Sequence, residues 1–169
     1  ATGNYNVSLT VTSNAGCISS ITQPFTINGA LPQSLFTING GSQQCSNTVV
    51  GVINNSTVDF GQIVKLEIYW DYSNDPTNKT TIMHPSPAAT FNHTYPEFFA
   101  PLSKTYVVNV VAYSGDNCLS SSTQTLTLKA TPEIVFDPLP GICVNQPSFQ
   151  ITQASLANAL PGNGVYSGP

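Results

Sequence analysis

Charge is scarce in this sequence, and arginine is absent. The 169 residues include four lysines and eight acidic residues, which give a formal net charge of -4. A nucleic-acid-binding protein needs clustered cations to displace counterions from phosphates, and four scattered lysines do not form such a cluster. The composition therefore argues against nucleic acid and acidic membranes as partners.

Long hydrophobic runs are also missing. The densest apolar stretch, 106–113, is interrupted by Asn109 and falls far short of the roughly 18 to 20 residues of a membrane-spanning helix. We therefore expect no membrane insertion. No cationic segment followed by an apolar one occurs at the start, so this stretch predicts no signal peptide. With 40% hydrophobic residues, the chain can still build a core.

Apolar and polar residues alternate with a period of two in several places. The clearest runs are 5–11, 66–70 and 106–110, in which every second side chain is apolar. Clusters of Gly, Asn, Asp, Ser and Pro, such as 39–42 and 114–117, separate these runs and are typical of turns. Short alternating strands at this spacing predict an all-β fold of the sandwich type.

An internal repeat relates two distant parts of the chain. When the sequence is shifted by 101 residues, Tyr5 falls on Tyr106 and Cys17 falls on Cys118, with many identities between them. Self-similarity at a fixed offset is the signature of repeated domains. We therefore interpret the two segments as the last two strands of two consecutive domains.

The repeat defines the expected domain organisation. Residues 1–29 would be the C-terminal strands of one domain, 30–130 a complete sandwich, and 131–169 the first part of a further repeat. The fold is thus predicted to consist of tandem sandwiches, one complete and two partial. Because partial sandwiches would expose strand edges and half of a core, we expect the chain to be a segment of a longer protein.

The four cysteines, Cys17, Cys45, Cys118 and Cys143, lie too far apart in sequence for a zinc knuckle. We expect a disulfide between Cys45, which precedes the second strand, and Cys118, which lies in the turn between the last two. Partners of Cys17 and Cys143 would then lie outside the segment. Disulfides would favour an oxidising compartment, and the alternative of four reduced cysteines in a cytosolic protein stays open.

Two short motifs are more specific than the composition. The hexapeptide WDYSND occupies 70–75, and the tetrapeptide HTYP occupies 93–96, ahead of the strand that begins near Tyr106. This combination resembles the PKD (polycystic kidney disease) domain, an immunoglobulin-like β-sandwich. Ser73 and Pro76 depart from the family's pattern, so we expect a turn of different shape.

The resemblance implies roles for the motif residues. Trp70 should lie in the core, and the Asp71 carboxylate should cap amides of the turn that also contains Asp75. His93 is expected to be structural, with its ring hydrogen-bonded to nearby backbone. Tyr95 and Tyr106 complete the structural motif.

The C-terminal segment carries a second resemblance. The stretches 142–145 and 164–169 look like a different immunoglobulin-like repeat that accompanies PKD domains in giant secreted proteins of Bacteroidota. Such proteins include surface adhesins of gliding bacteria that are exported through the type IX secretion pathway. The resemblance implies an extracellular, cell-surface location. The implied partners are neighbouring repeats and surface polysaccharide or proteins of the secretion and motility machinery.

Candidate reactive or binding residues are few. No nucleophile, metalloprotease or phosphate-loop motif occurs, so we predict neither an enzyme nor a cofactor. Asp71, Ser73 and Asp75 alternate as in a calcium loop, but Pro76 replaces its glycine and Ile82 its last ligand. This makes them weak calcium candidates. The candidate sugar-binding aromatic residues are Tyr69, Tyr72, Phe98 and Phe99.

The sequence favours a structural or adhesive repeat segment of a large cell-surface protein, acting as a stalk or spacer. The first alternative is an accessory module of a secreted hydrolase that binds polysaccharide or protein. A weaker alternative is a eukaryotic receptor ectodomain.

Overall fold

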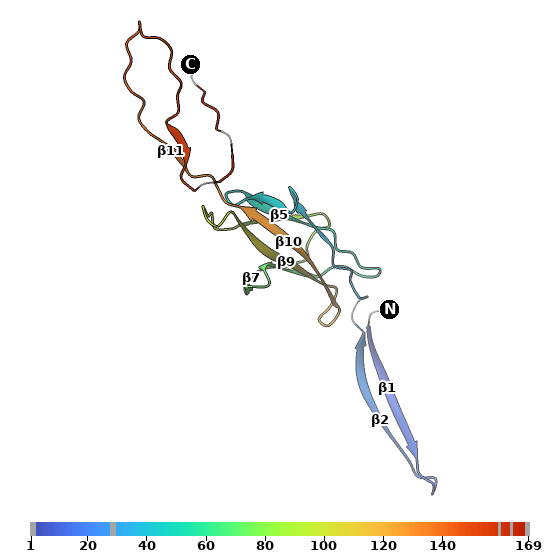
Figure 1. Ribbon diagram of the computed structural model, residues 1–169. Coiled ribbons are helices and arrows are strands. Elements are labelled where there is room, and N and C mark those ends of the chain that lie inside the picture. The colour runs from blue at the N-terminus through green and yellow to red at the C-terminus, as the bar shows by residue number, and fades with distance from the viewer. Residues whose placement is uncertain (1–2, 28–29, 159, 163, 168–169) are drawn as a thin grey trace.

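The computed structural model describes residues 3–27, 30–158, 160–162 and 164–167, and these residues form an all-β protein (Figure 1). The expected boundary after residue 29 and the end of the 164–169 motif fall outside the described residues. Among those described, no helix has the length and apolar character needed to span a membrane. The strands are β1 Gly3–Thr12, β2 Ile18–Ile27, β3 Phe36–Asn39, β4 Gln43–Cys45, β5 Val49–Asn54, β6 Lys65–Asp71, β7 Asp75–Met83, β8 Thr90–Thr94, β9 Ser103–Tyr113, β10 Leu119–Lys129, β11 Ile134–Phe136 and β12 Ala154–Leu156.

Strands β3 to β10 form two sheets that pack face to face. One sheet has five strands in the order β4-β10-β9-β6-β7, and the other has three in the order β3-β5-β8. Neighbouring strands are antiparallel except β4 and β10, which are parallel. The expected immunoglobulin-like sandwich fold is thus confirmed.

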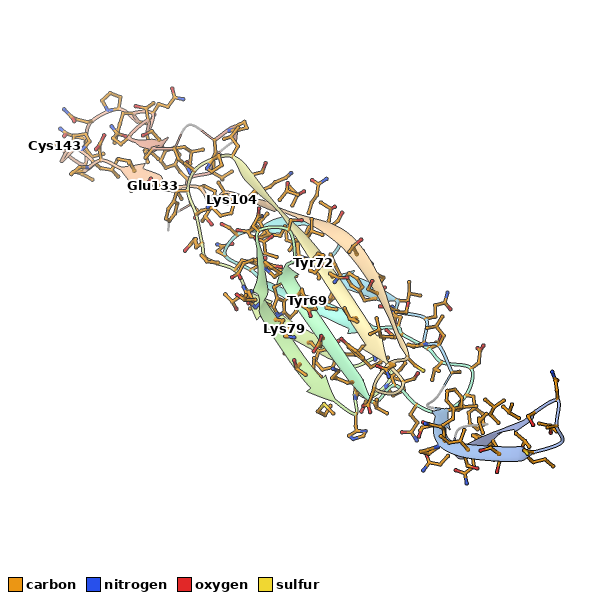
Figure 2. All side chains as sticks on the ribbon, turned by 90° about the horizontal axis from the view of Figure 1, so that it is seen from below. Tyr69, Tyr72, Lys79, Lys104, Glu133 and Cys143 are labelled. Carbon is orange, nitrogen blue, oxygen red and sulfur yellow. The ribbon has the colours of Figure 1, made fainter. Side chains whose placement is uncertain are left out.

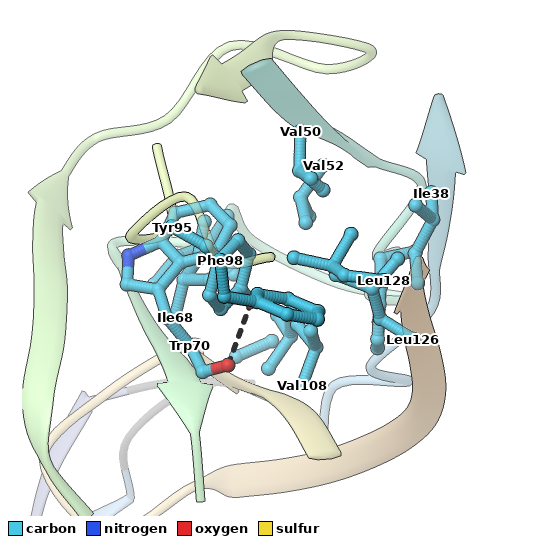
Figure 3. Packing of buried hydrophobic residues seen from close by; sticks show 14 of the residues in the cluster. Ile38, Val50, Val52, Ile68, Trp70, Tyr95, Phe98, Val108, Leu126 and Leu128 are labelled. Carbon is cyan, nitrogen blue, oxygen red and sulfur yellow. Dashed lines mark hydrogen bonds between the residues drawn. The ribbon is translucent and has the colours of Figure 1, made fainter. Parts of the chain in front are cut away.

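The core lies between the two sheets, and alternation along each strand decides which side chains enter it (Figure 3). On β6, Leu66, Ile68 and Trp70 are buried at 1% exposure or less, while the residues between them face the other side of the sheet. The remaining apolar members come from both sheets and the loop after β8: Phe36, Ile38, Val50, Val52, Tyr95, Phe98, Val108, Val110, Ala112, Leu126, Leu128 and Ala130.

Strands β1 and β2 form a hairpin with the register of β9 and β10. Tyr5 pairs with Phe25, and the residues 101 positions later, Tyr106 and Leu126, also pair. The hairpin turns match as well, because the Ser13 N–H donates to the Cys17 carbonyl at 2.8 Å and the Ser114 N–H to the Cys118 carbonyl at 3.0 Å. The repeat seen in the sequence therefore extends to strand pairing.

The two hairpins differ in burial. Large apolar side chains of β1 and β2 are 40% to 71% exposed, whereas their counterparts on β9, Val108, Val110 and Ala112, are buried. The difference has a simple cause: a three-stranded sheet covers β9 and β10, and no such sheet covers β1 and β2 among the described residues.

The chain enters and leaves the sandwich at opposite ends. Near its start, the Ala30 carbonyl accepts a hydrogen bond from Ser114 in the β9–β10 turn. It leaves after Lys129, the last residue of β10. Figure 1 shows the β1–β2 hairpin beyond one end of the sandwich and β11 beyond the other.

The expected disulfide between Cys45 and Cys118 is wrong. Cys45 pairs with Lys129 at the end of β10, because β4 runs parallel to that strand, whereas Cys118 lies immediately before Leu119 at its start. The 11 residues of β10 span about 33 Å, while a disulfide requires Cα atoms within about 7 Å. The partners proposed outside the segment for Cys17 and Cys143 followed from this pairing and lose their support.

Replacement of Trp70 tests how far the sandwich depends on its largest core side chain. Trp70→Ala would leave a cavity between the sheets and should lower the free energy of unfolding by about 3 to 5 kcal/mol. Circular dichroism melts of the whole chain measure the effect. Tyr72→Ala, which truncates a 47% exposed ring nearby, is the control and should have a much smaller effect. Equal losses for the two variants would contradict the core assignment.

Candidate functional site

The motif residues from the sequence gather into one aromatic cluster. The Trp70 and His93 rings stack at 4.6 Å with 9° between planes, and Tyr95 meets His93 edge-on at 4.7 Å. Tyr106 completes the row, with its ring 4.4 Å from that of Tyr95. The side chains come from β6, β8, the residue after β8, and β9. The cluster therefore links both sheets.

Two buried donors of this cluster have hydrogen-bond partners. The Tyr95 hydroxyl donates to the Trp70 carbonyl at 2.7 Å, as the dashed line in Figure 3 shows. The Trp70 indole N–H donates to the Thr80 hydroxyl at 2.9 Å. His93 contributes through ring stacking in the described residues, instead of the backbone hydrogen bond that the sequence led us to expect. Burial raises the pKa of Tyr95 and lowers the pKa of His93, so the cluster is neutral at physiological pH.

The Asp71–Asp75 turn is held by local hydrogen bonds. The Asp71 carboxylate accepts from the Asn74 side-chain amide at 3.0 and 3.2 Å, so the amide that it caps belongs to a side chain and not to the backbone. Asp75 accepts from the Thr77 N–H at 3.2 Å and from the Thr77 hydroxyl at 2.6 Å. Hydrogen bonding by Thr77 lowers the pKa of Asp75.

The calcium candidates Asp71, Ser73 and Asp75 lie in this turn. Among the residues that the structure describes, no group of three or more His, Cys, Asp or Glu side chains is placed to hold a metal ion. The carboxylates of Asp71 and Asp75 are already occupied as hydrogen-bond acceptors within the turn. The geometry gives calcium binding no support.

A polar cluster on the outer face of the five-stranded sheet was not found from the sequence. The side chain of Glu67 is 11% exposed and lies at its centre. Its Oε1 atom is 3.4 Å from Lys65 Nζ and 3.2 Å from Lys79 Nζ. Its Oε2 atom accepts hydrogen bonds from the hydroxyls of Tyr69 at 3.0 Å and Tyr113 at 2.9 Å. We call these five side chains the Glu67 cluster.

The partners of Glu67 determine its charge state. Burial alone would raise its pKa, but hydrogen bonds from Tyr113 and the other donors, together with the charge of Lys65, lower the pKa from 4.5 to about 2. Burial and the Glu67 charge raise the pKa of Tyr113 to about 12. The hydrogen bond to Glu67 also raises the pKa of Lys79. The cluster is therefore a carboxylate held ionised between two ammonium groups.

The outer face continues from the Glu67 cluster to Tyr72. The Tyr72 ring is 47% exposed and meets Tyr69 edge-on at 5.4 Å, and Figure 2 shows both residues on the same sheet as Lys79. Asn109 pairs with Tyr69 in the neighbouring strand and is 4% exposed, and its Oδ1 atom is buried without a hydrogen-bond partner. An unpaired buried acceptor usually destabilises a fold.

The four candidate sugar-binding aromatic residues do not form one platform. Phe98 is buried in the core, and Phe99 lies at the end of the sandwich where the chain leaves. Tyr69 and Tyr72 lie together on the outer face, but hydrogen bonding to Glu67 engages the Tyr69 hydroxyl. Of these two rings, that of Tyr72 is the more exposed.

A shallow hollow of about 420 Å³ lies beside the loop that contains His84. His84 and Ala88 both have positive φ, 50° and 57°, in a loop that also contains Pro85 and Pro87. The His84 N–H donates to the Val64 carbonyl at 2.8 Å, which anchors the loop to the residue before β6. The strained backbone thus shapes a loop at the end of the sandwich. His84 lies in the loop between β7 and β8.

Comparison with known proteins does not assign this geometry to a family. No protein-family model matches the chain, and no curated protein matches its sequence.

The Glu67 cluster predicts a specific dependence of stability on pH. The folded state holds the pKa of Glu67 at about 2, below its ordinary value of 4.5, so its contribution is present at neutral pH and is lost as the pH falls from about 5 to 2. We expect Glu67 to account for about 1 to 2 kcal/mol of that loss, since exposed lysines are partly screened. Urea denaturation of Glu67→Gln should show lower stability at pH 7 and a shallower decline.

Glu97→Gln removes an exposed carboxylate from the loop after β8 and serves as the matched control. Its pH profile should follow that of the unmodified chain. A decline for Glu67→Gln as steep as that of the unmodified chain would contradict the role given to the cluster.

Proposed function

We propose that the chain is a non-catalytic repeat segment of a large extracellular surface protein, in which it acts as a stalk or spacer. The observation that carries the proposal is the position of the chain ends on the sandwich. Ala30 contacts the β9–β10 turn, and the chain leaves beyond Lys129 at the far end of β10. Units connected in this way add length, because each extends the chain by the long dimension of a sandwich.

The β1–β2 hairpin supports tandem repetition. Its pairing register and turn hydrogen bond reproduce those of β9 and β10 after a shift of 101 residues. Its apolar side chains are exposed where those of the complete sandwich are covered. We infer that residues 1–29 are the last two strands of a preceding unit, and that residues 131–169 begin a following one.

The proposed family and location depend on the sequence motifs. The Trp70–Asp75 and His93–Pro96 motifs resemble PKD domains, and the C-terminal segment resembles repeats of giant secreted proteins of Bacteroidota, including adhesins of gliding bacteria. The proposal therefore places the segment on the cell surface, after export by the type IX pathway. Its partners would be neighbouring repeats and surface polysaccharide or proteins of the secretion and motility machinery.

An exchange in the full-length protein tests the spacer function. Residues 30–130 are replaced with an unrelated sandwich domain of the same end-to-end length, and a second variant deletes them. If the segment supplies length, the exchanged protein should keep the adhesion of whole cells while the deletion weakens it. Antibody labelling of intact cells checks that both variants are displayed equally. Equal loss in the two variants would contradict a spacer role, and labelling only after permeabilisation would contradict the location.

The outer face of the five-stranded sheet favours a second candidate, the accessory module that binds polysaccharide or protein. The specific observation is the exposed Tyr72 ring next to Tyr69, whose hydroxyl belongs to the polar Glu67 cluster. Aromatic rings with adjacent polar groups are suited to the apolar faces and hydroxyls of sugars.

Asn109→Leu tests the buried acceptor, and Tyr72→Ala separates the two candidates. Because the substitution removes an unpaired buried acceptor, it should stabilise the sandwich by about 1 kcal/mol, which thermal melts would show. Asn92→Leu, at an exposed position on β8, should have almost no effect. For a spacer, Tyr72→Ala leaves the signal on a polysaccharide array unchanged. A signal from the unmodified chain that Tyr72→Ala abolishes and the buried Asn109→Leu keeps would favour the binding module instead.

A further inference from the structure

The two junctions of the sandwich contain the same hydrogen-bonding device. Ala30 and Thr131, which are 101 residues apart, occupy equivalent positions beyond the last strand of a final hairpin. The Ala30 carbonyl accepts a hydrogen bond from the Ser114 hydroxyl, and the Thr131 carbonyl accepts one from the Asn158 side-chain amide at 2.8 Å. We call the residues that begin at Ala30 and at Thr131 the links between units. In both cases the donor is a side chain of the unit that follows the link.

At the C-terminal junction, Asn158 joins three parts of the chain. Its Nδ2 donates to the carbonyl of Phe99, in the loop after β8, at 3.0 Å and to that of Thr131 at 2.8 Å. Its Oδ1 accepts from the Glu133 N–H at 3.3 Å. One amide side chain thus connects the sandwich, the link and the first residues of the following unit.

The link itself is fixed to the sandwich. The Thr131 N–H donates to the Phe98 carbonyl at 3.0 Å, and its hydroxyl lies 2.9 Å from the hydroxyl of Ser46, which is fully buried. The Ala130 N–H donates to the Leu102 carbonyl at 3.0 Å. Because both residues have backbone partners in the sandwich, the chain is fixed to it as far as Thr131.

Apolar side chains from both units lie next to these hydrogen bonds. Leu160 of the following unit packs against the core of the sandwich. A mainly apolar hollow of about 780 Å³ between the units is lined by residues that include Leu102, Ala130, Ile134 and Leu156. Figure 2 shows Glu133 at this end of the sandwich and Cys143 farther along the same direction.

We propose that each end of the sandwich is a docking surface for the neighbouring unit of the same chain, and that a side chain of the following unit clamps the carbonyl of the first link residue. The clamp sets the angle between successive units and makes the array stiff. The partner is the adjacent repeat, since Asn158 and Leu160 already occupy the surface at the C-terminal end. The inference rests on the proposed spacer function and specifies how a spacer of this kind would keep its shape.

Residual dipolar couplings of the whole chain test the clamp. The amides of residues 33–130 and of 133–158 should fit one alignment tensor. Asn158→Asp keeps the acceptor for the Glu133 N–H but loses both donors, so it should abolish the common tensor and give a weaker, separate one for the following unit. Unchanged amide chemical shifts within the sandwich would show that the variant is still folded.

Asn145→Ala, at an exposed position in the turn after Cys143, is the matched control and should keep the common tensor. Ser114→Ala should separate the tensor of residues 3–27 from that of the sandwich. Two independent tensors in the unmodified chain, or one common tensor in Asn158→Asp, would overturn the proposal. Neither result would change the outcome of the domain-exchange experiment on whole cells. That experiment therefore still distinguishes a flexible spacer from a segment that is not a spacer.

Discussion

The structure depends on the burial of Trp70 between two sheets. This one residue contacts groups from several elements: its ring stacks on His93 of β8, its indole N–H donates to the Thr80 hydroxyl of β7, and its backbone carbonyl accepts from Tyr95. Because the Trp70 indole N–H and the Tyr95 hydroxyl both have hydrogen-bond partners, these two large aromatic residues are buried without an unsatisfied donor. The sheets are therefore held together where the Trp70–Asp75 and His93–Pro96 segments meet.

The strand that carries Trp70 also organises the opposite face of its sheet. Residues between the core positions of β6 place Glu67 and its lysine and tyrosine partners on the outside. The same alternation thus produces an apolar core and a polar network on two sides of a single strand. The network stabilises the outer face through hydrogen bonds to one carboxylate. Three of the few charged residues of the chain, Lys65, Glu67 and Lys79, are gathered there.

The course of β10 separates the two ends at which the chain enters and leaves the sandwich. Ala30 is hydrogen-bonded to the turn before β10, and the chain leaves after Lys129 at the other end of that strand. The parallel pairing of β4 with β10 places Cys45 beside Lys129 and far from Cys118. A sandwich with its two links at opposite ends is suited to a linear array. The side-chain clamps at Ala30 and Thr131 would convert such an array from a string of independent domains into a stiff rod.

The sequence alone determined the strands and the burial of Trp70, because alternation is a property of residues close to one another in the chain. It also determined the repeat of the final hairpin, because a fixed offset relates residues in equivalent positions. Only the tertiary structure decided which strands are neighbours. The sequence placed Cys45 and Cys118 together, and it missed the contacts of Glu67 with Lys79 and Tyr113 and those of Asn158 with Phe99 and Thr131. All of these depend on pairing between segments distant in sequence, and period-two alternation specifies the face of a strand but not its partner.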